Sequence, residues 1–269
     1  MSNPLSRRAL LSTAATGAVA LFLAGCNESK TEAATTAPKA ADATPAATPA
    51  ATPAATPAAT PAADPAKPAD AAAAAPAAPV EVPKAEGSVD VAKLLTPGLL
   101  KDIFIGKDDA KVTIVEYASM TCPHCRHFHE TTLPALTKKY IDTGKVRLVL
   151  REFPFDPRAS AAFMLARCAG DDKYYAMVGA LFQQQDNWAR ADDAKAALLQ
   201  LSRLAGFSQD SFDKCLTNQE LLNQVNASRE RASKDFGVES TPTFFINGQK
   251  YPGAMTIEQF SGIIDPLLG

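Results

Sequence analysis

Two cysteines separated by two residues carry the clearest chemical signal in the sequence, in the segment Cys122-Pro123-His124-Cys125. A pair at this spacing can form a reversible disulfide, but it is also a common half of a zinc site. Redox exchange needs an ionised thiol, because the thiolate is the attacking species. The spacing alone therefore leaves redox chemistry and metal binding open.

A structural zinc site usually draws a second ligand pair from further along the chain. No second Cys-x-x-Cys pair follows, so the local alternative would use Cys122, Cys125, His127 and His129. These four side chains would have to converge from about one and a half helical turns, which gives poor tetrahedral geometry. We therefore expect no metal, and we expect both histidines to lie on the helix surface.

The residues on either side of the cysteine pair favour the redox interpretation. Residues 111–117 are mostly apolar and β-branched, which predicts a buried strand. Proline suits the first turn of a helix, so Pro123 marks a helix start, and the pattern continues as a helix over residues 124–140. Pro134 lies inside that helix and is expected to kink it.

A cysteine at the start of a helix has its thiolate stabilised by the helix dipole and by free backbone N–H groups. Cys122 is therefore expected to be the acidic, exposed thiol, and Cys125 the buried one. His124 can donate to, or pair as a charge with, the Cys122 sulfur. A stabilised thiolate favours the reduced form, which makes the disulfide a strong oxidant.

The rest of the chain predicts an α/β domain. A second buried strand is expected over residues 146–150, and helical patterns fill the chain from 158 to about 236. A strand at 243–246 leads into an Asn-Gly hairpin, and a last helix covers 256–268. This order predicts a thioredoxin-like core over residues 89–269 with an inserted all-helical subdomain at about 157–236.

The N-terminus is typical of an export signal over residues 1–26. Two arginines precede an apolar run at residues 9–23, which is too short to cross a bilayer comfortably and suits a signal peptide. The run closes with Leu-Ala-Gly-Cys, the pattern of a lipoprotein signal, so we expect a lipid on Cys26. The arginine pair is also similar to a twin-arginine signal. General secretory export, ordinary cleavage near Gly25 and an uncleaved anchor remain alternatives.

Residues 27–88 are rich in alanine, proline and threonine and are expected to form a disordered tether. Repeated proline blocks a helix, and the segment has little from which to build a core. A lipid before the tether and a folded domain after it predict a periplasmic, membrane-anchored protein of the cell envelope. The formal net charge of −2 gives no indication of nucleic-acid binding.

Residues 115–125, Val-Glu-Tyr-Ala-Ser-Met-Thr-Cys-Pro-His-Cys, resemble the active site of the DsbA family of thiol–disulfide oxidoreductases. The resemblance covers roughly residues 106–268 and includes the helical insertion. It implies an enzyme that oxidises cysteine pairs in newly exported proteins, with no cofactor beyond the redox-active disulfide Cys122–Cys125. It also implies a quinone-linked membrane partner, of the DsbB kind, that reoxidises the enzyme.

The resemblance assigns further site residues. It implies that Glu116 is a buried acid that exchanges a proton with Cys125, although a glutamate facing solvent at a strand edge is the alternative. It also implies a cis Thr241–Pro242 bond against the disulfide, where the backbone before the proline pairs with substrate. A trans proline is the alternative there. Some relatives pair the buried acid with a basic residue, for which Arg151 is a candidate by strand position alone.

Two further pairs of residues are candidates for a structural role and a docking role. Cys168 and Cys215 lie in the helical block, and an oxidising compartment favours a structural disulfide between them. Some DsbA-like proteins carry such an extra bridge, and two buried free thiols are the alternative. Met120 and Phe128 flank the motif and are candidates for an apolar rim that docks substrate.

The leading hypothesis is an exported protein thiol–disulfide oxidase. A reductase or isomerase of the same fold stays open, because Thr241 precedes the proline. Dedicated isomerases of this family carry an N-terminal dimerisation domain where this chain has its tether, so a monomeric oxidase is favoured. A metal-binding or adhesion lipoprotein on a tether is the alternative from another class.

Overall fold

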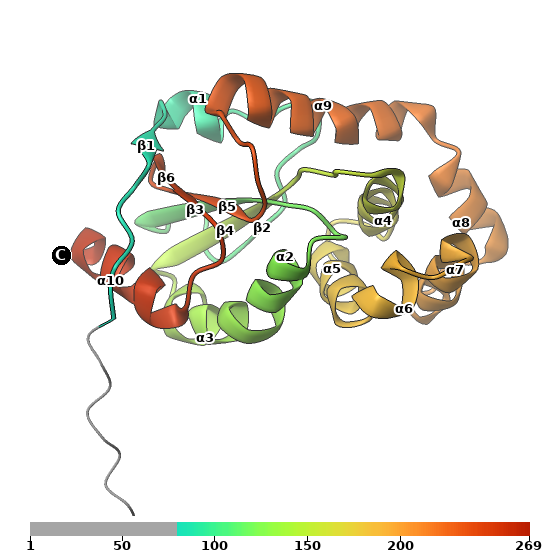
Figure 1. The fold of residues 1–269 in the computed structure, drawn as a ribbon, viewed down its shortest axis with the longest axis horizontal. Coiled ribbons are helices and arrows are strands. Elements are labelled where there is room, and N and C mark those ends of the chain that lie inside the picture. Colours follow the sequence, from blue (N-terminus) through green and yellow to red (C-terminus); the bar gives the residue numbers. More distant parts are fainter. Residues whose placement is uncertain (1–79) are drawn as a thin grey trace, which may run out of the picture. The chain divides into compact units, whose positions relative to one another are not determined.

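The computed structural model describes residues 80–269 (Figure 1). The predicted signal peptide, the lipidation site Cys26 and residues 27–79 of the predicted tether lie outside the described residues. The folded part begins before Val89, the predicted start of the domain. The backbone N–H of Glu86 donates to the Lys250 carbonyl at 2.9 Å, and residues 87–88 pair with a later strand.

A six-stranded sheet forms the centre of the described part, in the order β1-β6-β5-β3-β4-β2. β3 and β4 run parallel, while β5 pairs with β3 in the antiparallel direction. All seven residues of β3 are buried, because helices cover both faces of the sheet (Figure 1). The strands are β1 (Gly87–Ser88), β2 (Phe104–Ile105), β3 (Val112–Ala118), β4 (Val146–Glu152), β5 (Thr243–Ile246) and β6 (Gln249–Pro252).

The helix that follows β3 is continuous from Pro123 to Ile141 but changes its winding. It consists of α2 (Pro123–His127), η1 (Phe128–Thr132), α3 (Leu133–Leu136) and η2 (Thr137–Ile141), where both η segments are π-helical turns. The N–H of Leu133 reaches back five residues to the Phe128 carbonyl. Since Pro134 has no N–H to donate, the predicted disturbance appears as a wider turn just before it.

Two hydrophobic clusters hold helices on opposite faces of the sheet. On one face the helix after β3 and α10 (Ile257–Leu268) pack against β3, β4 and β5, and the Phe128 and Phe244 ring centroids lie 4.7 Å apart. On the other face α1 (Val91–Leu95) and α9 (Gln219–Phe236) pack through Leu94 and Phe236. The sheet is therefore enclosed, which keeps the end of β3 rigid where the cysteine motif begins.

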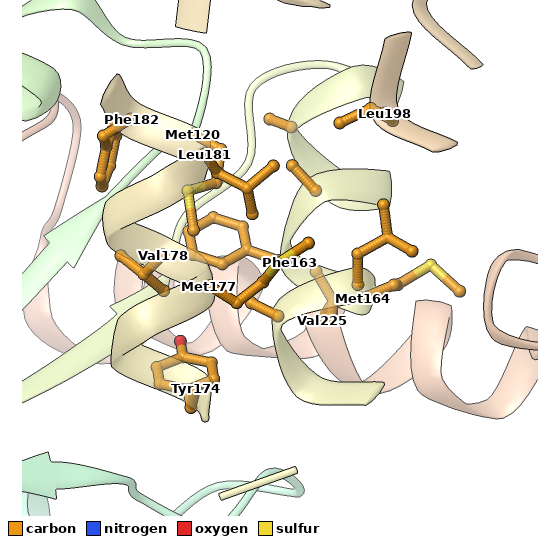
Figure 2. Packing of buried hydrophobic residues seen from close by; sticks show 14 of the residues in the cluster. Met120, Phe163, Met164, Tyr174, Met177, Val178, Leu181, Phe182, Leu198 and Val225 are labelled. Atoms are coloured by element: carbon orange, nitrogen blue, oxygen red, sulfur yellow. The ribbon is translucent and has the colours of Figure 1, made fainter. Parts of the chain in front are cut away.

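A helical block enters the chain between β4 and β5. It contains α4 (Pro157–Cys168), α5 (Tyr174–Gln183), α6 (Gln185–Ala189), α7 (Ala194–Leu204) and α8 (Gln209–Leu216), and α9 leads back to the sheet. Figure 2 shows its core, where Phe163 of α4 faces Met177 and Leu181 of α5. Within residues 80–269 no helix combines the length and hydropathy that crossing a bilayer requires. The predicted order of strands and helices is confirmed from residue 111 onward, while β1, α1 and β2 were not predicted.

A disulfide joins Cys168 at the end of α4 to Cys215 in α8, at a sequence separation of 47. We expect replacement of both cysteines by alanine to lower the free energy of unfolding by about 4 kcal/mol, because the cross-link restricts the unfolded chain. Chemical denaturation of the oxidised protein measures this loss. The redox potential of Cys122–Cys125 should stay unchanged, because the bridge lies outside the motif, and a large shift in that potential would refute its purely structural role.

Candidate active site

Cys122 lies at the point where the turn after β3 enters α2. Its backbone is extended, with φ −79° and ψ 121°, and its N–H donates to the Ser119 carbonyl at 3.0 Å. It is the residue before the first helical position, which Pro123 occupies as the sequence predicts. Cys122 is half-buried and Cys125 is buried, and both are free thiols. The structure therefore presents the reduced, dithiol form of the pair.

The surroundings of Cys122 favour its thiolate. Its pKa is lowered from 9.0 to about 5, chiefly because the Cys125 thiol donates to its sulfur. The Thr241 hydroxyl and the backbone N–H groups of Cys125 and His124 act in the same direction, against partial burial. The His124 side chain is exposed, and its backbone N–H is the His124 group that bonds to the sulfur. The backbone N–H of His124 therefore stabilises the Cys122 thiolate, a role that was predicted for the His124 imidazole.

Cys125 has the opposite character. Its side chain is fully buried one turn into the helix, and burial raises its pKa well above the ordinary value. The Cys122 sulfur and the negative charge of Glu116 act in the same direction. Desolvation and nearby negative charge both oppose ionisation of a thiol. One cysteine of the pair is thus built to be a thiolate and the other to keep its proton.

Glu116 is fully buried in β3, and its partner is His129 of η1. The His129 Nε2 atom lies 3.0 and 3.2 Å from the two carboxylate oxygens, and the His129 side chain is only 4% exposed. The ring packs against Phe182 of α5, with 4.4 Å between the centroids. The prediction that His129 lies on the helix surface was wrong, because the ring is enclosed between the sheet and the helical block.

Arg151 is not the partner of the buried acid. Its guanidinium donates to both Asp102 oxygens at 2.8 and 2.7 Å and to the Tyr117 hydroxyl at 3.0 Å. Arg151 stands opposite Tyr117 in the β3–β4 register, one residue beyond Glu116. Neighbouring residues of a strand point to opposite faces, so Arg151 and Glu116 lie on different sides of the sheet. The helical spacing of Cys125 and His129 was the signal that could have found the correct partner.

The Thr241–Pro242 peptide bond is cis and precedes β5. The Cys122 thiol lies 3.3 Å from the Thr241 carbonyl oxygen, to which it donates. The Thr241 hydroxyl is buried and has no hydrogen-bond partner within the described part of the chain. Because a hydroxyl hydrogen can rotate, this group is free to donate to the sulfur once Cys122 ionises. The fold thus brings together two motifs that lie 119 residues apart.

Of three further residues, Met120 and Phe128 lie elsewhere than expected, and His127 lies on the helix surface as expected. Met120 and Phe128 are fully buried, so the predicted apolar rim was wrong: both side chains belong to the core. His127 is exposed, and its Nε2 atom lies 3.5 Å from the Thr131 hydroxyl. Among residues 80–269 no three histidine, cysteine or acidic side chains are grouped as metal ligands.

Two contacts of the active-site turn were not predicted. The Thr121 hydroxyl donates to Asp156, which also caps the N-terminus of α4. The buried amide of Gln185, in α6, donates to the carbonyl oxygens of Met120 and Cys122. Both partners come from beyond β4, so no local pattern in the sequence links them to the cysteine motif.

Comparisons with known proteins agree with this geometry. A family model described as thioredoxin matches residues 99–266. A putative protein-disulfide oxidoreductase of Rickettsia typhi is 35% identical over 168 residues, and a probable disulfide bond formation protein D of Bacillus anthracis is 31% identical over 153 residues. These matches cover 62% and 54% of this chain, and 62% and 69% of those proteins.

Solved structures show the same fold. The crystal structure of Wolbachia pipientis α-DsbA1 superposes with a TM-score of 0.62 at 32% identity, covering 67% of this chain and 96% of that one. BdbD from Bacillus subtilis superposes at 0.57 with 20% identity, covering 69% of this chain and 99% of that one. The predicted thioredoxin-like fold is confirmed. The chain therefore belongs to the thioredoxin family and is one of its DsbA-like members.

Proposed function

We propose that the protein is an exported thiol–disulfide oxidoreductase that introduces disulfide bonds into newly exported proteins. The observation that carries this proposal is the contrast between the two thiols, with the pKa of Cys122 lowered to about 5 and that of Cys125 raised. The catalytic group would be the Cys122–Cys125 disulfide itself. The relatives named for disulfide oxidoreduction and disulfide bond formation support the same reaction class.

In the oxidising direction, a substrate thiolate attacks the Cys122 sulfur of the Cys122–Cys125 disulfide. The bond between the two enzyme sulfurs breaks, a mixed disulfide forms at Cys122, and Cys125 leaves and takes up a proton. A second substrate thiolate then attacks the substrate sulfur of the mixed disulfide, which releases Cys122 as a thiolate. The substrate loses two electrons, and the enzyme ends as the dithiol form that the structure presents.

The environment of each sulfur suits one step of this sequence. Cys122 is a good leaving group because its thiolate accepts hydrogen bonds at the start of α2, next to Thr241. Cys125 departs into a buried position where an uncompensated charge is costly, so it needs a proton. Glu116, whose charge acts on Cys125 and whose carboxylate meets His129, is the group we assign to that proton transfer.

The direction of net reaction follows from which redox state is stabilised. A thiolate that is stable at neutral pH favours the dithiol form, and the disulfide then accepts electrons readily. DsbA is the established example of such an oxidising couple. We therefore favour oxidation of substrates over reduction or isomerisation.

Export and anchoring extend the proposal to the cell envelope. The N-terminal signal pattern, the Leu-Ala-Gly-Cys sequence at Cys26 and the Ala/Pro/Thr-rich segment support a monomer tethered in the periplasm by a lipid. A DsbB-like, quinone-linked membrane protein is the partner we propose for reoxidation. Substrates would be exported proteins with pairs of cysteine thiols.

The low pKa of Cys122 predicts a specific alkylation profile. Reduced protein should react with iodoacetamide at a rate that rises with pH around a midpoint near 5, because the thiolate is the reactive species. Cys122→Ala should abolish this fast reaction, while Cys125→Ala should keep a reactive thiol whose midpoint lies at higher pH, because the Cys125 donor is lost. Fast alkylation that survives in Cys122→Ala would show that the assignment is wrong.

The same shift predicts how stability depends on pH. A thiol whose pKa is lower in the folded protein than in the unfolded chain stabilises the folded, reduced protein. This contribution is complete at pH values above the unfolded-state pKa, and it is lost as pH falls through about 5. The reduced protein should therefore gain stability relative to the oxidised protein as pH rises from 5 towards 8.5. Urea denaturation of both forms across this range measures the difference. If the oxidised form is more stable than the reduced form at pH 8, the proposal that the protein is an oxidase is contradicted.

The redox potential of the pair tests the direction of reaction. Equilibration with glutathione buffers should give a potential less negative than about −180 mV, as expected for a strong protein oxidant. A value near −270 mV, typical of thioredoxin, would favour the reductase alternative. Thiol trapping in the exporting cell gives an independent answer, because a pair that is chiefly reduced there would refute the oxidase proposal.

The charge of Glu116 predicts an effect on Cys125. Glu116→Gln should lower the pKa of Cys125, because the carboxylate charge is one of the causes that raise it, while burial should keep it above the ordinary value. The Cβ chemical shift of Cys125 followed against pH measures the change. Glu130→Gln is the matched control, since Glu130 is an exposed glutamate on the helix that carries Cys125. A Cys125 pKa that rises or stays constant in Glu116→Gln would contradict the assignment.

A further inference from the structure

Gln185 belongs to the helical block, yet its side chain reaches the turn that carries the reactive cysteine. It is the first residue of α6 and is only 3% exposed. Its Nε2 atom donates to the Met120 carbonyl at 2.8 Å and to the Cys122 carbonyl at 3.1 Å. One amide group thereby spans the turn between β3 and α2, with Thr121 between its two acceptors.

Contacts on both sides of Gln185 hold it in this position. Three residues later, the buried indole of Trp188 donates through Nε1 to the Leu181 carbonyl at 2.8 Å, which folds α6 back onto α5. The next residue, Asp186, accepts from the Arg126 guanidinium of α2 at 2.5 Å. The start of α6 is therefore tied both to the core of the insertion and to the helix that begins at Cys122.

One of the two carbonyl groups that Gln185 binds belongs to Cys122 itself, and the other to Met120, two residues earlier. The Cys122 carbonyl also accepts the N–H of Arg126 at 3.1 Å, which is the first backbone bond of α2. A carbonyl that accepts two donors has its direction defined and its partial negative charge compensated. Loss of the amide would leave the buried Met120 carbonyl to find another donor, since an unsatisfied buried acceptor is costly.

The direction of the Cys122 side chain depends on this turn. The sulfur meets the backbone N–H groups of His124 and Cys125 and the Thr241 carbonyl only while the Cys122 backbone keeps its extended conformation ahead of α2. The two backbone N–H groups are among the donors that favour the Cys122 thiolate, whereas burial and the charge of Glu116 oppose ionisation of Cys125. A side chain that fixes the turn therefore acts on the reactive sulfur without touching it.

We propose that Gln185 is a positioning residue, which holds the Met120 and Cys122 carbonyls so that the Cys122 sulfur stays at the N-terminus of α2. The inference rests on the proposed role of Cys122 as the reactive thiol. It assigns the helical block a part in setting the chemistry of the cysteine pair.

The test replaces Gln185 by methionine, which keeps the length of the side chain and removes both donors. We expect the pKa of Cys122 to rise by about one, a tenfold change in the thiolate ratio, and the couple to become about 30 mV more reducing. Ultraviolet absorbance of the thiolate against pH and equilibration with glutathione measure the two effects. The pKa of Cys122 should rise further in Gln185→Glu, because the glutamate side chain has the same shape but its ionised oxygens cannot donate.

Gln183→Met is the matched control, because Gln183 is an exposed glutamine two residues earlier. It should leave the pKa of Cys122 and the potential at their wild-type values. A purely structural role for Gln185 would lower the stability of the oxidised and reduced proteins equally, whereas the positioning role should lower that of the reduced form more.

The outcomes separate this inference from the proposed function. If wild-type Cys122 titrates near 5 and Gln185→Met behaves like Gln183→Met, the positioning role is refuted and the oxidase proposal stands. If wild-type Cys122 titrates near the ordinary value of about 8.5, the proposed function itself fails.

Discussion

The chemistry of the site rests on one interaction, the hydrogen bonding of a single sulfur at the start of a helix. Backbone N–H groups at a helix N-terminus have no partners within the helix, so they are available to stabilise an anion. Cys122 occupies this position; the Cys125 thiol also donates to its sulfur, and the Thr241 hydroxyl can do so once Cys122 ionises. Every other element of the site either holds this sulfur in place or separates it chemically from its partner.

The separation of the two thiols depends on the sheet. β3 delivers the motif and also carries Glu116 beneath it, so the same buried strand positions the reactive turn and the charge that opposes ionisation of Cys125. Enclosure by helices on both faces excludes water from that charge and makes the His129 contact important. The half-buried Cys122 sulfur and the buried Glu116–His129 pair are thus two results of one layered arrangement.

The helical block contributes more than bulk to this arrangement. It supplies Phe182, which covers the His129 ring, Asp156, which binds Thr121, and Gln185, which binds the turn. Its own core and its disulfide make it a rigid support. A site that depends on angstrom-level placement of a sulfur gains from such support, because loose positioning would weaken each hydrogen bond to the thiolate.

Local patterns were enough to predict the order of elements from residue 111 onward and the position of the cysteine pair, because apolar strand runs, Pro123 and the cysteine spacing can all be read from neighbouring residues. The resemblance to DsbA pointed to Glu116 and Pro242. The residues that complete the site became known from tertiary contacts alone. His129 is the partner of Glu116 and Arg151 is not, because the strand register sends Arg151 to the other face. Gln185 and Asp156 reach the turn across 65 and 35 residues. Such contacts follow from how layers pack, and packing joins residues that no pattern in the linear sequence connects.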